Sequence, residues 1–125
     1  AMYKPYHLIG LELGISVASI ALRGEATGAT GDWRGDVVAT AKRHLKAGET
    51  LDGEGGFTVY GKVIPAADSL RLGGLPIGLA HHMVLKRDIP AGHVVSWHDV
   101  EFDAGSQVVQ VRREMEELFR REWQK

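Results

Sequence analysis

The chain has 125 residues, a length that suits one domain with a buried core. It contains no cysteine, which excludes disulfides and thiolate metal sites and is typical of a reducing compartment, so we expect a cytoplasmic protein. Its 15 basic and 16 acidic residues are mixed along the chain and give a net charge of −1, so we expect neither nucleic acid nor a membrane as a partner.

The first element is an apolar segment, 7–23, whose length favours a buried helix over a strand. It is too short, and with Glu12 too polar, to cross a membrane. Its apolar side chains point in nearly all directions, and such a helix needs cover on every side. Small residues at Gly10, Gly14 and Ala18 would let another helix approach closely. We therefore expect the segment to pack in a larger body, either preceding domains of a longer chain or a homodimer.

A glycine-rich connector, 24–36, follows the helix and has no periodic pattern, so we place the domain boundary there. We assign residues 1–30 to the helical segment, as the end of a preceding catalytic domain, with its linker. Residues 31–104 are assigned to a β domain, and residues 105–125 to a C-terminal helix.

Short runs of apolar residues between glycine-rich turns predict a succession of short strands in the β domain. The predicted elements are, in chain order, strands at 37–42, 49–51 and 57–63, a helical turn at 66–72, a glycine-rich corner at 73–78, and strands at 80–87 and 93–96. Ser96 with Asp99 three residues later resembles a helix N-cap with its acidic partner.

The tail, 107–125, is predicted to form an amphipathic helix. Its apolar side chains recur at spacings of three and four and predict one buried face: Val108, Val111, Met115, Leu118 and Phe119. Charged residues cover the other faces, and Glu116–Arg120 and Glu117–Arg121 have the spacing of stabilising ion pairs.

A repeated unit with an offset of 44 residues dominates the β domain. The matched positions are Lys42/Lys86, Arg43/Arg87, Leu45/Ile89, Ala47/Ala91, Gly48/Gly92 and Leu51/Val95. A unit used twice in a short chain predicts one supersecondary piece packed against its own copy. Gly48 and Gly92 are placed where the turn requires a positive φ.

The second copy resembles the SAF domain, a family named after sialic acid synthase, antifreeze and flagellar assembly proteins, whose fold is the β-clip. Residues 86–100 carry the likeness: a strand, a turn with Pro90 and Gly92, a short strand and an Asp-Val step. Gly78 matches the glycine that precedes the second copy. The resemblance covers roughly 37–103 and implies a mainly β (α+β) fold, a β-clip of two related halves with a helix at each end.

A second resemblance covers almost the entire chain. Residues 3–17 followed by the double unit look like the C-terminal part of bacterial NAD(P)-dependent oxidoreductases that resemble homoserine dehydrogenase, some of which act as reductoisomerases similar to deoxyxylulose-phosphate reductoisomerase. In that family a Rossmann domain and a central catalytic domain come first. The resemblance implies that 3–23 is the last helix of the central domain.

The nucleotide-binding motif of those enzymes is missing from this chain. Residues 53–56 contain three glycines but lack the Gly-x-Gly-x-x-Gly spacing, the following helix and the distant acid. We therefore expect a non-catalytic domain without a cofactor of its own, with NAD(P) held by the parent enzyme. Its expected role is to help close the substrate site or to join subunits. The alternatives are a stand-alone module that binds a sugar acid or other small anion, and a dimerisation element.

Basic side chains at equivalent places in the two copies are candidate anion ligands, because guanidinium groups recognise carboxylates and phosphates through paired hydrogen bonds. They are Lys42, Arg43, Lys86 and Arg87. Sialic acid synthases use their SAF domain near a sugar-acid substrate, and Arg34 is only near the place where the resemblance would put an arginine for that contact. The competing interpretation is that these charges protect exposed strand ends from pairing. His7 and Glu12 on the first helix are candidates for the substrate site of the complete enzyme; otherwise they serve the helix end.

Histidines crowd the second copy, at His81, His82, His93 and His98. Adjacent residues on a strand point to opposite faces, so His81 and His82 are not expected to share a metal, and no metal site is predicted. Four acidic residues, Asp32, Asp36, Asp52 and Glu54, are expected to make local hydrogen bonds in glycine-rich turns. Trp33 is predicted to be exposed as an interface residue, whereas Trp97 and Trp123 are predicted to pack.

Overall fold

The computed structural model describes residue 3 and residues 5–28 and 31–123. It divides into two units, Ala1–Asp32 and Trp33–Lys125. The first contains the helix α1 (Ile9–Arg23), which ends at Gly24 in the left-handed conformation, where the Gly24 N–H donates to the carbonyl of Ile20. The helix predicted at 7–23 is therefore confirmed, with its start two residues later. None of the described helices is long and apolar enough to span a membrane.

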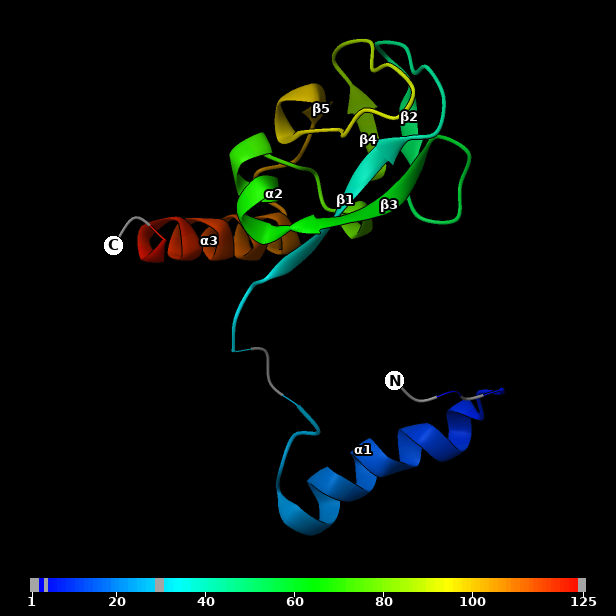
Figure 1. Cartoon of the computed structure of the whole chain (residues 1–125), viewed down its shortest axis with the longest axis vertical. Coiled ribbons are helices and arrows are strands. Elements are labelled where there is room, and N and C mark those ends of the chain that lie inside the picture. Colours follow the sequence, from blue (N-terminus) through cyan, green and yellow to red (C-terminus); the bar gives the residue numbers. More distant parts are fainter. Residues whose placement is uncertain (1–2, 4, 29–30, 124–125) are drawn as a thin grey trace. The chain divides into compact units, whose positions relative to one another are not determined.

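The second unit holds two small antiparallel sheets and two α-helices (Figure 1). One sheet pairs β1 with β3, and the other has the order β2-β4-β5. The elements are, in chain order, β1 (Gly35–Ala41), β2 (Thr50–Asp52), β3 (Val59–Pro65), α2 (Ala66–Leu72), the 3-10 turn η1 (Ile77–Leu79), β4 (His81–Leu85), the 3-10 turn η2 (Trp97–Asp99), β5 (Val100–Glu101) and α3 (Gln107–Glu122). The predicted mainly β, α+β fold is confirmed.

Backbone hydrogen bonds between the two copies obey the 44-residue offset. Leu45 and Ile89, which are equivalent positions, exchange both N–H···O bonds at 2.9 Å. The Gly48 N–H donates to Leu85 at 2.7 Å, and the equivalent Gly92 N–H donates to Ala41 at 2.8 Å. Each bond maps onto the other when the copies are exchanged, so the two halves are related by an approximate twofold axis, as the repeat predicts.

The second half departs from the first in its return segment, 93–96, which is predicted as a strand but makes only single bridges. The reason is that Val95 divides its backbone bonds between two neighbours. Its N–H donates to Ala39 of β1 and its carbonyl accepts from Leu75, so no ladder continues along one partner.

A single apolar cluster fills the space between the halves, with Leu45, Leu51, Leu75 and Val95 fully buried. Trp97 is also buried, as predicted, but the prediction for Trp33 is wrong: it is only 7% exposed. Side chains of α3 cover Trp33, with the rings of Phe119 and Trp123 at 5.7 and 5.8 Å and the Arg112 guanidinium over its face at 4.7 Å.

The amphipathic helix α3 is confirmed, but its packed face only partly matches the predicted one, since Met115 and Phe119 are partly buried as predicted and the other three residues are not. Val108, Val111 and Leu118 are more than half exposed, whereas Val109 and Glu116 are buried. The buried face of α3 carries the charged side chains of Arg112 and Glu116, because Asp36 and Trp97 of the β domain bind them. Of the predicted ion pairs, Glu117–Arg121 forms at 3.5 Å, and Glu116 pairs with two preceding arginines of α3 rather than with Arg120.

Candidate functional site

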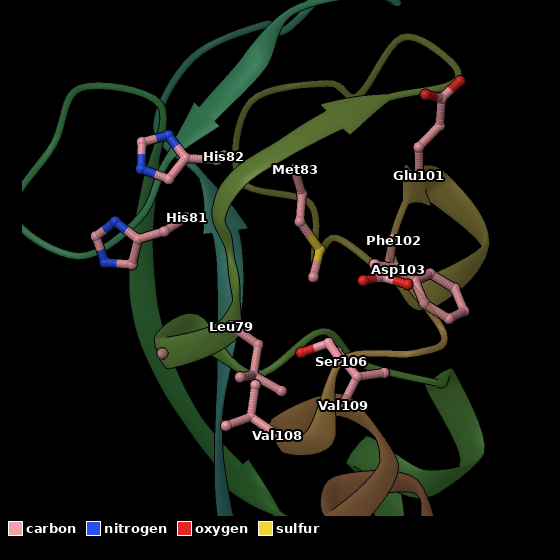
Figure 2. A pocket seen from close by; sticks show the side chains of 11 residues that line it. Leu79, His81, His82, Met83, Glu101, Phe102, Asp103, Ser106, Val108 and Val109 are labelled. Atoms are coloured by element: carbon pink, nitrogen blue, oxygen red, sulfur yellow. The ribbon is translucent and has the colours of Figure 1, made fainter.

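A pocket of about 320 Å³ lies beside the start of β4 (Figure 2). Residues of η1, β4 and the first turn of α3 form it, together with the segment that follows β5. Leu79, Met83 and Val109 give it an apolar floor, and Glu101 and Asp103 stand at its rim. Figure 2 shows the imidazoles of His81 and His82 on one side of the strand and Glu101 at its opposite end. The polar groups therefore do not converge on one reacting atom, and the pocket suits a small, mainly apolar ligand.

The wall of this pocket contains a local backbone strain at His82. Its φ of 61° is the one positive value at a non-glycine residue in the described parts of the chain. The pairing of β2 with β4 shifts register here, and the ring of His81 lies so close over Gly53 that a Cβ at residue 53 would clash with the ring. The positive φ and the register shift interrupt the regular strand that the sequence predicts here, and they accompany the close packing of the His81 ring on Gly53.

The predicted opposite orientation of the two histidines is wrong, because the strand is not regular at His82. Their ring centroids lie 6.2 Å apart. Among the described residues, no three His, Cys, Asp or Glu side chains lie together in a way that could hold a metal ion.

The basic residues singled out in the two copies are mostly engaged inside their own half. Arg43 binds Glu49 through Nη2 at 2.6 Å, Arg87 binds Asp99, and the Lys42 ammonium donates to the carbonyl of Gly56. Lys86 is exposed. These partners compete with any external anion for the same guanidinium and ammonium donors.

The other candidate ligands have backbone or local roles. The carbonyl of Arg34 accepts the Ala66 N–H at 3.0 Å, which joins the start of β1 to the start of α2. In the first unit, His7 Nδ1 lies 3.6 Å from Glu12 Oε2, and Glu12 Oε1 accepts the N–H of Leu8 at 3.3 Å. Glu12 thus stabilises the first turn of α1, where the helix dipole favours a negative charge.

The two predicted turn glycines are confirmed in conformation. Gly48 and Gly92 have φ values of 84° and 78°. Gly78 has no positive φ and lies in η1, and Pro90 follows Ile89 by a trans bond. The cap predicted at Ser96 forms as a capping box with Asp99, whose Oδ2 accepts the Ser96 N–H at 2.7 Å.

Asp88 joins the two halves, a role that was not predicted from the sequence. Its carboxylate accepts the Ala47 N–H at 2.9 Å and the Lys46 ammonium at 3.0 Å, and it lies 3.3 Å from His44 Nε2. The backbone bond from Ala47 and the bond from Lys46 lower the pKa of Asp88 to about 2. The sequence did contain a signal for this contact, because the 44-residue offset makes Asp88 the equivalent of His44, and equivalent residues of two packed copies can lie close together.

A buried ionic network holds α3 on the β domain. Arg112 forks over Asp36, with Nη1–Oδ1 at 3.1 Å and Nη2–Oδ2 at 2.5 Å, and its Nε donates to Glu116 at 2.8 Å. The Ser69 hydroxyl donates to Asp36 at 2.5 Å, and Trp97 Nε1 donates to Glu116 at 3.2 Å.

The network overturns one sequence interpretation, that Asp36 makes only local hydrogen bonds in a turn, and it also includes Ser69. Both side chains are buried. Burial alone would raise the pKa of Asp36, but the hydrogen bonds from Arg112 and Ser69 outweigh it and lower that pKa. The network satisfies its own donors and acceptors, so its role is structural.

The described structure is thus a small β-clip-like domain of two related halves, closed by a C-terminal helix, with a shallow pocket at one end. The family model of the SAF domain matches residues 36–101, more than half of the chain. The chain belongs to the SAF domain family, as the resemblance of its second copy indicated. No curated protein matches the chain.

Proposed function

We propose that this chain is an accessory SAF domain that carries out no chemistry of its own and supports an NAD(P)-dependent oxidoreductase or reductoisomerase. It would act by closing the substrate site or by joining subunits. The observation that carries the proposal is the apolar surface of α1. Large apolar side chains on two opposite sides of this helix, and Leu8 just before it, are at least half exposed: Leu8, Ile9, Leu11, Leu13, Ile15, Val17, Ile20 and Leu22.

Such a helix is unfavourable in water. Each Å² of apolar surface left in water forgoes about 25 cal/mol, and a 15-residue helix has little stability without tertiary packing. One partner helix would cover a single stripe, whereas large apolar side chains here lie on two opposite sides of the helix. Cover on several sides is what the interior of a preceding domain supplies. This requirement agrees with the resemblance of residues 3–17 and the following double unit to the C-terminal part of those enzymes.

The described carboxylates also support an accessory role. Asp36, Asp88 and Asp99 hold helices, turns or the two halves together, and burial or hydrogen bonding accounts for each perturbed pKa. A group committed to several structural hydrogen bonds is a poor general acid or base. We therefore assign NAD(P) binding to polypeptide of the parent enzyme outside these 125 residues.

An antibody against residues 33–125 tests the proposal in the native source. The native polypeptide that carries this domain is expected to be larger than 13.6 kDa and to bind NADH or NADPH, measured by nucleotide fluorescence, whereas the 125-residue chain binds neither. In the parent enzyme, Leu13→Asp is expected to abolish reductase activity or subunit association. The matched control is Val63→Asp, at a similarly exposed apolar position on β3, which leaves both intact. A native polypeptide that binds no nicotinamide nucleotide would overturn the proposal.

The second candidate function is a stand-alone module that binds a sugar acid or other small anion. The pocket beside β4 does not favour it, since Glu101 and Asp103 repel an anion. A different surface, between α2 and α3, does favour anion binding, because Arg71, Arg113 and Arg120 line it. A thermal-shift screen of sugar acids at millimolar concentration tests this candidate, and the absence of any shift would remove it.

A further inference from the structure

A cleft between α2 and α3 gathers arginines that the repeat does not predict. Two adjoining hollows of about 410 and 500 Å³ share the walls Leu70, Arg71 and Arg120. Arg113 and His98 complete the first hollow, and Trp123 closes the second. The cleft lies within the second unit, where α2 and α3 are neighbours (Figure 1).

The guanidinium groups of this cleft differ in whether they already pair with a carboxylate of the protein. Arg71 pairs with Asp68 at 3.0 Å, and its side chain is 72% exposed. Arg113 pairs at 2.7 Å with Glu116, whose other oxygen is taken by Arg112. The Arg120 guanidinium makes no hydrogen bond or ion pair with any described residue.

The local balance of charge is positive. Three guanidinium groups line the cleft, those of Arg71, Arg113 and Arg120, and two carboxylates pair with them, those of Asp68 and Glu116. Asp36 and Glu116 are buried and committed to the network that holds α3, so they cannot swing out to neutralise Arg120. Exposed pairs such as Arg71–Asp68 contribute little and exchange readily with a competing anion.

We propose that this cleft binds a small organic oxyanion, a carboxylate or phosphate ester, with Arg120 as its principal ligand. Arg71 and Arg113 reach the same anion from the walls, because a guanidinium group presents several N–H donors in a planar fork that fits two oxygens at once. Leu70 and the half-exposed Trp123 give the organic part of the ligand an apolar surface.

The basic residues of the repeat are poorer anion ligands than Arg120. Arg43 and Arg87 each have an acidic partner in their own half, whereas Arg120 lies on a helix outside the repeat. The inference does not depend on the accessory role proposed above: an accessory domain can lack this site, and a domain with this site need not belong to an oxidoreductase.

The test uses the full chain at constant ionic strength, with Trp fluorescence and isothermal titration as readouts. The probes are inorganic phosphate, glycerol 3-phosphate and succinate, with chloride as the reference. We expect saturable binding of at least one probe with a dissociation constant of about 1 mM or lower. Tighter binding of glycerol 3-phosphate than of succinate identifies a phosphate-ester site, and the reverse order identifies a carboxylate site.

Arg120→Gln is expected to weaken binding by about tenfold or more, because a hydrogen bond to a charged group is lost. The matched control is Arg121→Gln, which removes the same charge from the next residue, one that does not line the cleft, and leaves binding unchanged. Equal melting temperatures of the two variants establish that both are folded.

Three results would overturn the proposal. They are the absence of saturation by any probe up to about 10 mM, equal weakening by the two substitutions, and binding of an acidic peptide alone. The last result would assign the cleft to a protein partner instead of a small molecule. None of them bears on nucleotide binding by the parent enzyme, so failure here is distinguishable from failure of the accessory role.

Discussion

Replacing Asp36 by alanine is the most direct perturbation of the contact between α3 and the β domain. The carboxylate accepts two bonds from Arg112, one from Ser69 and one from the Val37 N–H, and it is only 7% exposed. Its loss leaves both Nη atoms of Arg112, whose side chain is 12% exposed, without a carboxylate partner, and only Glu116 still binds the guanidinium, through Nε. Removal of one partner of a buried pair costs about 3–5 kcal/mol. For a domain of this size, about 3 kcal/mol lowers the melting temperature by about 12 °C or more.

Urea unfolding of the full chain, followed by circular dichroism and Trp fluorescence, measures this loss. Asp68→Ala is the control, because it removes an exposed partner of Arg71 and is expected to cost about 1 kcal/mol or less. The double substitution Asp36→Ala with Arg112→Met should cost less than the two single losses together, since no unpaired charge stays buried. A loss below about 1 kcal/mol for Asp36→Ala would refute the assignment of Asp36 as the main anchor of α3.

Three further predictions concern the turns, the strained strand and the acid range. Gly48→Ala is expected to lower the free energy of unfolding by about 1–2 kcal/mol, because φ is 84° at this residue. The control is Gly78→Ala, which is expected to be neutral because Gly78 has no positive φ and a Cβ there would have open space. Equal effects of the two substitutions in urea unfolding would contradict this prediction. His82→Gly is expected to raise the melting temperature by a few degrees by relieving the positive φ, and a fall would show that the side chain outweighs the strain. Asp52 and Asp88 have folded-state pKa values lowered to about 2, so their stabilisation is present above the unfolded pKa near 4 and is lost as the pH falls towards 2. Acid titration by circular dichroism should therefore show weakening between pH 4 and 2, and a constant melting temperature over that range would contradict it.

The short-range elements were predictable because their signals are local. Glycine at the turn positions, the Ser96–Asp99 cap and the strands beside them depend on residues a few places apart. The 44-residue offset carried further information, because a repeat predicts that two copies pack alike. The reciprocal bonds between Leu45 and Ile89 bear this out.

The face through which α3 packs was not predictable in the same way. Periodicity selects the stripe with the most apolar residues, and that stripe includes Val108 and Val111, which are exposed. The face that packs includes Phe119 of that stripe together with the charged residues Arg112 and Glu116. Its choice depends on Asp36, far away in the sequence, and no local pattern reports such a partner.

The sequence by itself determined that this protein contains a β unit used twice, with glycine at its turns and a helix towards each end of the chain, and that it belongs with SAF domains. These properties follow from backbone preferences and hydrophobic periodicity, which act over a few residues and repeat along the chain. Only the tertiary structure decided which charged side chains form ion pairs within the protein and which remain free to bind a ligand in the cleft between α2 and α3. That outcome depends on distances between residues remote in the chain, and electrostatic pairing is fixed only when the fold brings them within about 4 Å.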